Sequence, residues 1–230
     1  MTAAAREQVA AASRRLAAEG LLVGTAGNVS VRVGERVAVT ASGVVLGGAT
    51  ADDVVLVTLD GARVEAGDRG LVPTSELDLH LGVYADSPDV GAVVHTHAPY
   101  STAVACVLDE LPVLHYQHLL LGGAVRVAPY ATFGTPELAG FVRTALAGRQ
   151  AALMANHGSV AVGATLAQAV EHAVLLEWLA TLHHRASALG TPRALTDDEQ
   201  TAVVLAALAR SYGRDHGQDH GQDHGQGSPS

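Results

Sequence analysis

The chain has 230 residues, of which 48% are hydrophobic, and a formal net charge of -9 at pH 7. This length suits a single domain with one sizeable hydrophobic core. The acidic balance excludes an ordinary nucleic-acid partner, because a phosphate backbone needs a basic face. No apolar run is long enough to span a membrane, and the charged N-terminus does not resemble a secretory signal, so we expect a cytoplasmic protein without a membrane partner.

Two residue types constrain the chemistry further. All 14 basic residues are arginines, and the absence of lysine excludes a Schiff base between a side chain and a carbonyl substrate. Cys106 is the only cysteine, which excludes an internal disulfide. It lies in an apolar stretch, so we expect a buried, inert thiol.

Hydrophobic periodicity predicts helices and strands that mix without a regular βαβ alternation. The expected helices cover residues 3–19, 74–84, 101–108, 165–189 and 197–210. The expected strands cover residues 29–33, 37–40, 54–59, 90–97, 125–128 and 151–163, the last broken at 156–158. This pattern favours an α/β fold with a mixed or antiparallel sheet layered with helices.

The C-terminal end differs from the rest of the chain. From residue 215 it repeats the unit DHGQ and contains no apolar residue to bury. We therefore expect a folded domain over residues 1–213 and a disordered tail over residues 214–230. Adventitious metal binding by the tail histidines is the less favoured alternative.

Two histidines close the apolar run GAVVHTHAPY. His95 and His97 occupy positions i and i+2 of a predicted strand, so their imidazoles face the same side and can converge on one metal ion. A polar strand end with water as its partner is the alternative. His157 interrupts another apolar strand, where a polar group without a partner is costly. Together with Glu76, these histidines suit Zn²⁺.

A metal ion with a free coordination position would supply the electron sink that lysine cannot provide here. Glu76 could leave the ion and act as a base. His80, one helical turn later, is expected to orient Glu76. Three further histidines are expected at the surface or an interface, and the roles of His115 and His118 stay open. Those three are His172, His183 and His184.

Three short turns rich in glycine and hydroxyl groups occur at residues 24–30, 41–43 and 73–75. Backbone N–H groups in such turns bind phosphate without lysine. One such turn is usually only a turn. Three of them, the last adjoining Glu76, predict an anion site.

These motifs, in their order, resemble the class II aldolase/adducin family. The resemblance rests on GTAGNVSVR, the S-E of TSELDLH, AVVHTHA, the HY of VLHYQH, APYATFGT and NHG, and it extends from about residue 10 to residue 212. It implies a three-layer α/β/α fold around a mainly antiparallel mixed sheet. It also implies a homotetramer with active sites between subunits.

The resemblance also implies residue roles. Zinc would be held by His95, His97 and His157, with Glu76 as resting-state ligand and catalytic acid/base. Tyr116 would act from the neighbouring subunit as a proton donor. Tyr212 would also serve catalysis. The substrate phosphate would be held by Gly27, Asn28, Ser42, Gly43, Thr74 and Ser75.

The implied reaction is reversible cleavage of a ketose 1-phosphate of the L-fuculose 1-phosphate type to dihydroxyacetone phosphate and an aldehyde. Epimerases of the family carry aspartate where this chain has Glu76, which favours cleavage. Dehydratases and decarboxylases share the metal site and stay open as alternatives. A non-catalytic, adducin-like scaffold is less favoured because the metal ligands are present. Leu77, Asp78 and residues 117–121 depart from the family's fuculose pattern, so the sequence leaves the aldehyde half open.

Overall fold

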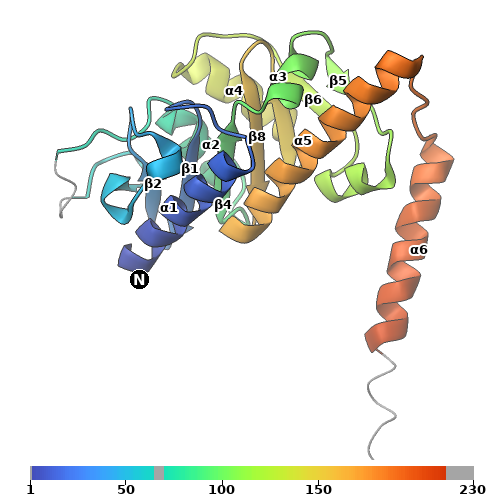
Figure 1. Ribbon diagram of the computed structural model, residues 1–230. Helices are drawn as coiled ribbons and strands as arrows, with labels where there is room; N and C mark the ends of the chain where they lie inside the picture. Colours follow the sequence, from blue (N-terminus) through green and yellow to red (C-terminus); the bar gives the residue numbers. More distant parts are fainter. Residues whose placement is uncertain (1, 65–69, 216–230) are drawn as a thin grey trace, which may run out of the picture.

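The computed structural model describes residues 2–64 and 70–215 (Figure 1). Most of the predicted tail, residues 216–230, lies outside this part. Within the described residues, no helix combines the length and the apolar character that a membrane crossing would need.

The described residues form one sheet of eight strands in the order β3-β2-β1-β4-β8-β7-β6-β5. Neighbouring strands are antiparallel except β6 and β7, which are parallel. The strands are β1 (Asn28–Val33), β2 (Arg36–Thr40), β3 (Val54–Thr58), β4 (Ala92–Thr96), β5 (Glu110–Leu111), β6 (Val125–Ala128), β7 (Ala151–Met154) and β8 (Gly158–Gly163).

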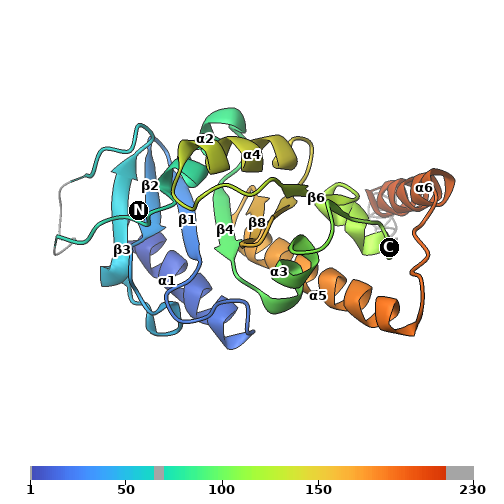
Figure 2. The same ribbon diagram turned by 90° about the horizontal axis from the view of Figure 1, so that it is seen from above.

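Helices cover both faces of this sheet (Figure 2). One face carries α1 (Thr2–Ala18), α3 (Pro99–Ala105) and α5 (Leu166–Leu189). The other carries α2 (Leu77–Asp86) and α4 (Pro136–Leu146). The predicted three-layer α/β/α fold around a mainly antiparallel mixed sheet is therefore confirmed.

The remaining helical segments lie outside these layers. Short 3₁₀ helices cover Leu46–Gly48 (η1), Ala51–Asp53 (η2) and Tyr116–Leu121 (η3). The last helix, α6 (Asp197–Asp215), projects away from the body of the molecule (Figure 1).

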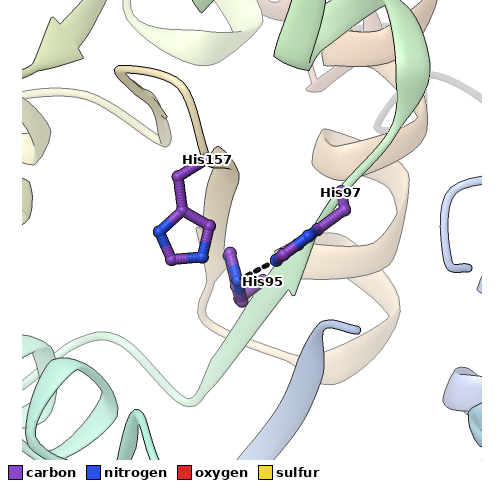
Figure 3. Close-up of side chains that lie close together, drawn as sticks. All are labelled: His95, His97 and His157. Carbon is purple, nitrogen blue, oxygen red and sulfur yellow. Dashed lines mark hydrogen bonds between the residues drawn. The ribbon is translucent and has the colours of Figure 1, made fainter. Parts of the chain in front are cut away.

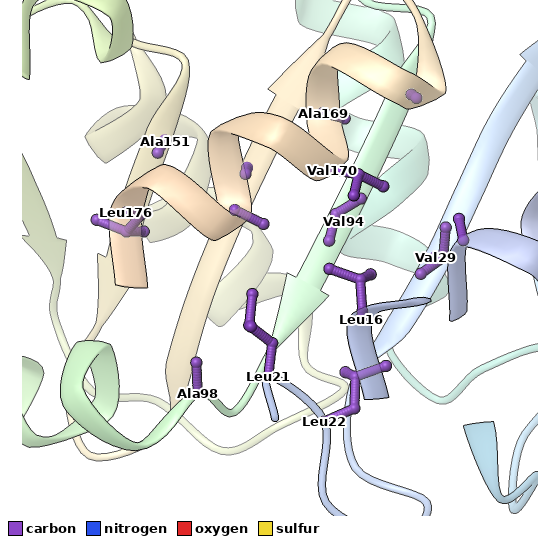
Figure 4. Close-up of a cluster of buried hydrophobic side chains, with 14 of the residues drawn as sticks. Leu16, Leu21, Leu22, Val29, Val94, Ala98, Ala151, Ala169, Val170 and Leu176 are labelled. Atoms are coloured by element: carbon purple, nitrogen blue, oxygen red, sulfur yellow. The ribbon is translucent and has the colours of Figure 1, made fainter. Parts of the chain in front are cut away.

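Each face of the sheet has its own hydrophobic core. Figure 4 shows the α1/α5 side, where Leu16 and Val170 lie over Val29 of β1 and Val94 of β4. The second core, under α2 and α4, includes Val93 on the opposite side of β4. Since β4 is apolar on both faces, it is a central strand, and the histidines at its end are held on a rigid support.

Three of the differences from the sequence prediction have a clear local cause. Helix α2 begins at Leu77 and not at Thr74, because the backbone N–H of Thr74 bonds to the carbonyl of Thr40 and ties the segment to the end of β2. Helix α4 was not predicted, although Thr135 caps it with its side chain and Pro136 follows at the first helical position, which is an ordinary start signal. Cys106 is exposed, so the expectation of a buried thiol was wrong: α3 ends at Ala105 and leaves the thiol in solvent.

Candidate active site

The three predicted histidine ligands meet at one end of the central strands (Figure 3). His95 lies near the end of β4, His97 follows it, and His157 lies in the turn between β7 and β8. Their ligand nitrogens all lie within 4.8 Å of one another. Asn156, with φ of 54°, adopts the left-handed conformation that this turn needs, which asparagine tolerates better than most residues.

His95 is fully buried, and its hydrogen bond defines which ring nitrogen is free. The Nδ1 atom lies 2.9 Å from the carbonyl oxygen of Ser159, which can only accept, so Nδ1 carries the proton. The lone pair of Nε2 therefore points into the cluster, where it lies 2.9 Å from Nε2 of His97 and 3.0 Å from Oε2 of Glu76. Two imidazole nitrogens and a carboxylate oxygen at these distances form the arrangement that is expected around a bound cation.

Glu76 completes the cluster from the N-cap position of α2, yet its side chain makes no capping hydrogen bond. It is 6% exposed. Its Oε1 atom has no hydrogen-bond partner among the described residues and lies 3.4 Å from Nε2 of His157. A buried carboxylate oxygen without a donor is costly, so this arrangement fits a metal ligand.

The protonation states also suit metal binding. Burial alone would raise the pKa of Glu76, but the neighbouring His95, Asn28 and His157 outweigh this effect and hold its pKa below the usual range. Burial lowers the pKa of His97 to about 4 and also lowers the pKa of His157. Near pH 7 Glu76 is therefore a carboxylate, and His97 and His157 are neutral imidazoles, the forms that coordinate metals. Three imidazoles and one carboxylate make a zinc-type donor set.

A pocket of about 360 Å³ opens beside the cluster, within the usual range for small-molecule sites. Its lining includes Glu76, His97 and His157. It also includes all six predicted phosphate residues, so the structure brings the three turns together: Gly27, Asn28, Ser42, Gly43, Thr74 and Ser75. None of the described residues that line it is an arginine, so an anion here would depend on N–H and hydroxyl donors.

Gly27 shows why glycine is needed in the first turn. Its φ is +95°, a conformation that side chains rarely adopt. A Cβ atom would also lie 2.5 Å from Cδ2 of Leu22 and 2.8 Å from the carbonyl oxygen of His95. The absence of a side chain thus allows the turn to approach the metal-binding strand.

Asn28 follows at the start of β1 and links the glycine-rich turn to Glu76 of the histidine cluster. Its Nδ2 atom donates to Oε2 of Glu76 over 3.0 Å, and its Oδ1 atom contacts Nε2 of His80. The hydrogen-bonded path from His80 to Glu76 therefore runs through Asn28.

Sequence reasoning assigned no role to several other pocket residues. Tyr130, Ala131, Phe133 and Asn156 line the pocket, and the side chains of Tyr130 and Phe133 are about two-thirds exposed, at 65% and 66%. The signal that could have found the first three is the segment APYATFGT, where two aromatic residues stand in a loop between β6 and α4.

Of the two predicted catalytic tyrosines, the structure describes the side chain of Tyr116. Tyr116 lies at the start of η3, 55% exposed, beside the ring of His115. It does not line the pocket described above. The side chain of Tyr212 lies outside the described part of the structure, although its backbone belongs to α6.

Three of the remaining described histidines have structural partners. His172 is buried and donates from Nδ1 to the carbonyl oxygen of Val162, so its expected surface position was wrong. His118 is also buried and donates to the carbonyl oxygen of His115. His184 is exposed and its ring lies against Tyr100, as its predicted surface position requires.

Comparison with known proteins agrees with the geometry. Residues 7–184 match the Class II Aldolase and Adducin N-terminal domain family. A 5-methylthioribulose-1-phosphate/5-deoxyribulose-1-phosphate aldolase of Rhodospirillum rubrum is 41% identical over 194 residues, covering 84% of this chain and 86% of that protein. A 5-deoxy-D-ribulose 1-phosphate aldolase of Bacillus thuringiensis is 38% identical over 196 residues, covering 84% and 91%.

A solved structure of an L-fuculose 1-phosphate aldolase superposes with a TM-score of 0.83 at 33% sequence identity, covering 89% of this chain and 96% of that one. The names of these relatives confirm the expectation of a lyase. Both the family match and the identities extend over most of the chain, and so this chain belongs to the class II aldolase/adducin family.

Proposed function

We propose that the protein is a zinc-dependent aldolase that cleaves a ketose 1-phosphate between C3 and C4 to dihydroxyacetone phosphate and an aldehyde. The observation that carries this proposal is the placement of Glu76 between a three-histidine cluster and the three phosphate-type turns, in one pocket. The reacting carbon C3 lies only two bonds from the phosphorylated carbon C1, so the acid/base group and the phosphate donors must lie in the same pocket.

For the substrate, we infer a 5-deoxypentulose 1-phosphate or its 5-methylthio counterpart. The two relatives above that are 41% and 38% identical are named for these sugars. Cleavage between C3 and C4 of such a sugar releases a two-carbon aldehyde with an apolar substituent. The apolar surface that Tyr130, Ala131 and Phe133 add to the pocket suits such a substituent better than a hydroxylated one.

His95, His97, His157 and Glu76 would hold the zinc ion. When bound, the ion supplies a Lewis acid that polarises the substrate carbonyl. Glu76 delivers a proton to C3 after the C3–C4 bond breaks, and removes it in the condensation direction. The N–H and hydroxyl groups of the three turns bind the phosphate and thereby fix C3 near Glu76.

Assembly is part of the proposal. Tyr116 is exposed and does not line the pocket of its own chain, which supports a role at the pocket of a neighbouring subunit. There it would handle the proton of the aldehyde oxygen, with Tyr212 as a further catalytic group. We therefore propose a homotetramer with shared active sites that works in the cytoplasm.

The decisive test is Glu76→Gln. It keeps the shape of the side chain but removes the base, so zinc should stay bound through the histidines. Positioned acid/base groups contribute typically ~10²- to 10⁴-fold, so cleavage should fall by a factor in that range. Exchange of the C3 proton of dihydroxyacetone phosphate with solvent deuterium should fall equally, and this assay needs no aldehyde.

The matched control is Asp78→Asn, which removes one carboxylate from the same helix at an exposed position outside the pocket. It should leave zinc content, cleavage and exchange unchanged. Undiminished exchange in zinc-loaded Glu76→Gln would assign the base to another residue. Elemental analysis without stoichiometric zinc, or a panel of ketose 1-phosphates without cleavage, would refute the proposed function.

A further inference from the structure

A chain of buried polar groups runs from Glu76 into the protein interior, away from the pocket. Nδ2 of Asn28 lies 3.0 Å from Oε2 of Glu76, and Oδ1 of Asn28 contacts Nε2 of His80. On the far side of the imidazole, Nδ1 of His80 lies 2.7 Å from Oγ of Ser30, which lies 2.7 Å from the hydroxyl of Tyr84. We propose that His80 is a positioning residue, which through Asn28 fixes the orientation of Glu76.

The direction of every hydrogen bond in this chain follows from its first member. A carboxylate only accepts, so Asn28 presents its N–H₂ group to Glu76 and its carbonyl oxygen to His80. That oxygen also only accepts, so Nε2 of His80 carries the ring proton. Nδ1 then accepts from the hydroxyl of Ser30, whose oxygen accepts in turn from Tyr84.

Burial makes this order costly to break. Ser30 and His80 are fully buried, and Asn28 and Tyr84 are only 4% and 2% exposed. Water therefore cannot replace a lost partner cheaply, and an unpaired donor or acceptor in such a place costs roughly 1–3 kcal/mol by general experience. A rotated amide of Asn28 would also point its oxygen at the carboxylate of Glu76. His80 opposes that rotation, because its Nε2–H needs an acceptor.

As a consequence, the two carboxylate oxygens of Glu76 have different hydrogen-bond partners. Oε2 accepts from Asn28 and faces His95 at 3.0 Å, whereas Oε1 has no hydrogen-bond partner among the described residues. The chain therefore fixes Oε2 through Asn28 while that oxygen faces the histidines, and leaves Oε1, without a donor in the described part of the protein, as the atom that can carry the proton. The role of Oε1 in the reaction rests on the proposed function. The direction of the hydrogen bonds from Tyr84 to Glu76 does not depend on it.

Two substitutions separate the positioning role from mere packing. In His80→Gln, the amide nitrogen can reach the place of Nε2 and still donate to Asn28. In His80→Asn, the shorter side chain ends near the place of Nδ1 and loses the bond to Asn28. Both remove a buried ring, so a purely structural role predicts similar losses in both variants.

We expect the two variants to differ. Residues that orient metal ligands typically change affinity or activity by ~10- to 100-fold, so His80→Asn should bind Zn²⁺ more weakly and turn over more slowly than His80→Gln by a factor in this range. The loss of turnover should appear in kcat more than in KM for the ketose phosphate, because Asn28 alone among the six predicted phosphate residues bonds to His80 through its side chain. Equal losses of zinc affinity and turnover in the two variants would overturn the proposal.

A spectroscopic measurement tests the hydrogen-bond order without any substrate. In protein labelled with ¹⁵N-histidine, the His80 signal, identified by its absence in His80→Gln, should show a neutral ring protonated at Nε2. A ring protonated at Nδ1 would overturn the proposal even in an active enzyme. If no ketose phosphate is cleaved, the proposed function fails, while this spectrum and the zinc affinities still decide the role of His80.

Discussion

Gly27→Ala should damage the protein more than an ordinary glycine substitution in a turn. The added Cβ atom would lie 2.5 Å from Leu22 Cδ2 and 2.8 Å from the carbonyl oxygen of His95. The side chain of Leu22 can move, but the carbonyl belongs to β4, whose residue His95 pairs with Asn28 of β1. Relief of the clash therefore requires β1 and β4 to shift near the metal site.

Two terms set the size of the effect. A side chain at φ of +95° costs of order 1–3 kcal/mol. Overpacking against atoms that cannot move freely costs roughly another 1–3 kcal/mol. We therefore expect the free energy of unfolding to fall by about 2–6 kcal/mol, together with weaker zinc binding, because the backbone of His95 is displaced.

Gly24→Ala is the matched control. Gly24 also has a positive φ, +62°, but a Cβ atom there would meet nothing within 4 Å. The Gly24→Ala variant should lose roughly 1–2 kcal/mol of unfolding free energy, because only the cost of a side chain at positive φ applies, and it should keep its zinc affinity. Urea unfolding and zinc titration of both variants measure the difference. If Gly27→Ala lost no more stability than Gly24→Ala and bound zinc equally well, the close approach of this turn to His95 would be refuted.

Three further predictions concern protonation, a helix end and assembly. Burial lowers the pKa of His80 from 6.5 to about 3. Between these two pH values His80 is therefore protonated in the unfolded chain and neutral in the native protein. The free energy of unfolding should therefore fall as the pH drops from about 6.5 to about 3, by at most ~1.4 kcal/mol per pH unit. The fall should be less steep in His80→Gln. If the free energy of unfolding, measured with urea, depended on pH equally in both proteins over this range, the prediction would be contradicted. Glu177 accepts two backbone N–H groups at the start of α3, 2.9 Å and 2.8 Å away, so Glu177→Ala should lower stability by roughly 1.5–3 kcal/mol in urea unfolding, whereas no loss would exclude this role. If Tyr116 acts across an interface, co-assembled Tyr116→Phe and Glu76→Gln chains should recover activity that neither has alone, and mixed oligomers without recovery would count against shared sites.

The local part of the structure was readable from the sequence. Short apolar and β-branched runs predicted the central strands, and the i, i+2 spacing placed His95 and His97 on one side of the predicted strand. Glycine-rich segments predicted the turns that line the pocket, because the backbone conformations they allow are a property of the residue itself. The start of α2 was misplaced because a tertiary contact, the bond from Thr74 to Thr40, overrides the local capping pattern.

The relations between distant segments were decided only by the tertiary structure. Asn28 and Glu76 are 48 residues apart in the chain, yet the pairing of β1 with β4 and the entry of α2 beneath them bring their side chains to 3.0 Å. Helical spacing placed His80 one turn after Glu76 and predicted that it orients Glu76, but it could not identify the group between them. The order of the strands inserts Asn28 between them. Sequence spacing thus identified the chemical groups, and sheet order, which no local pattern encodes, determined which of them touch.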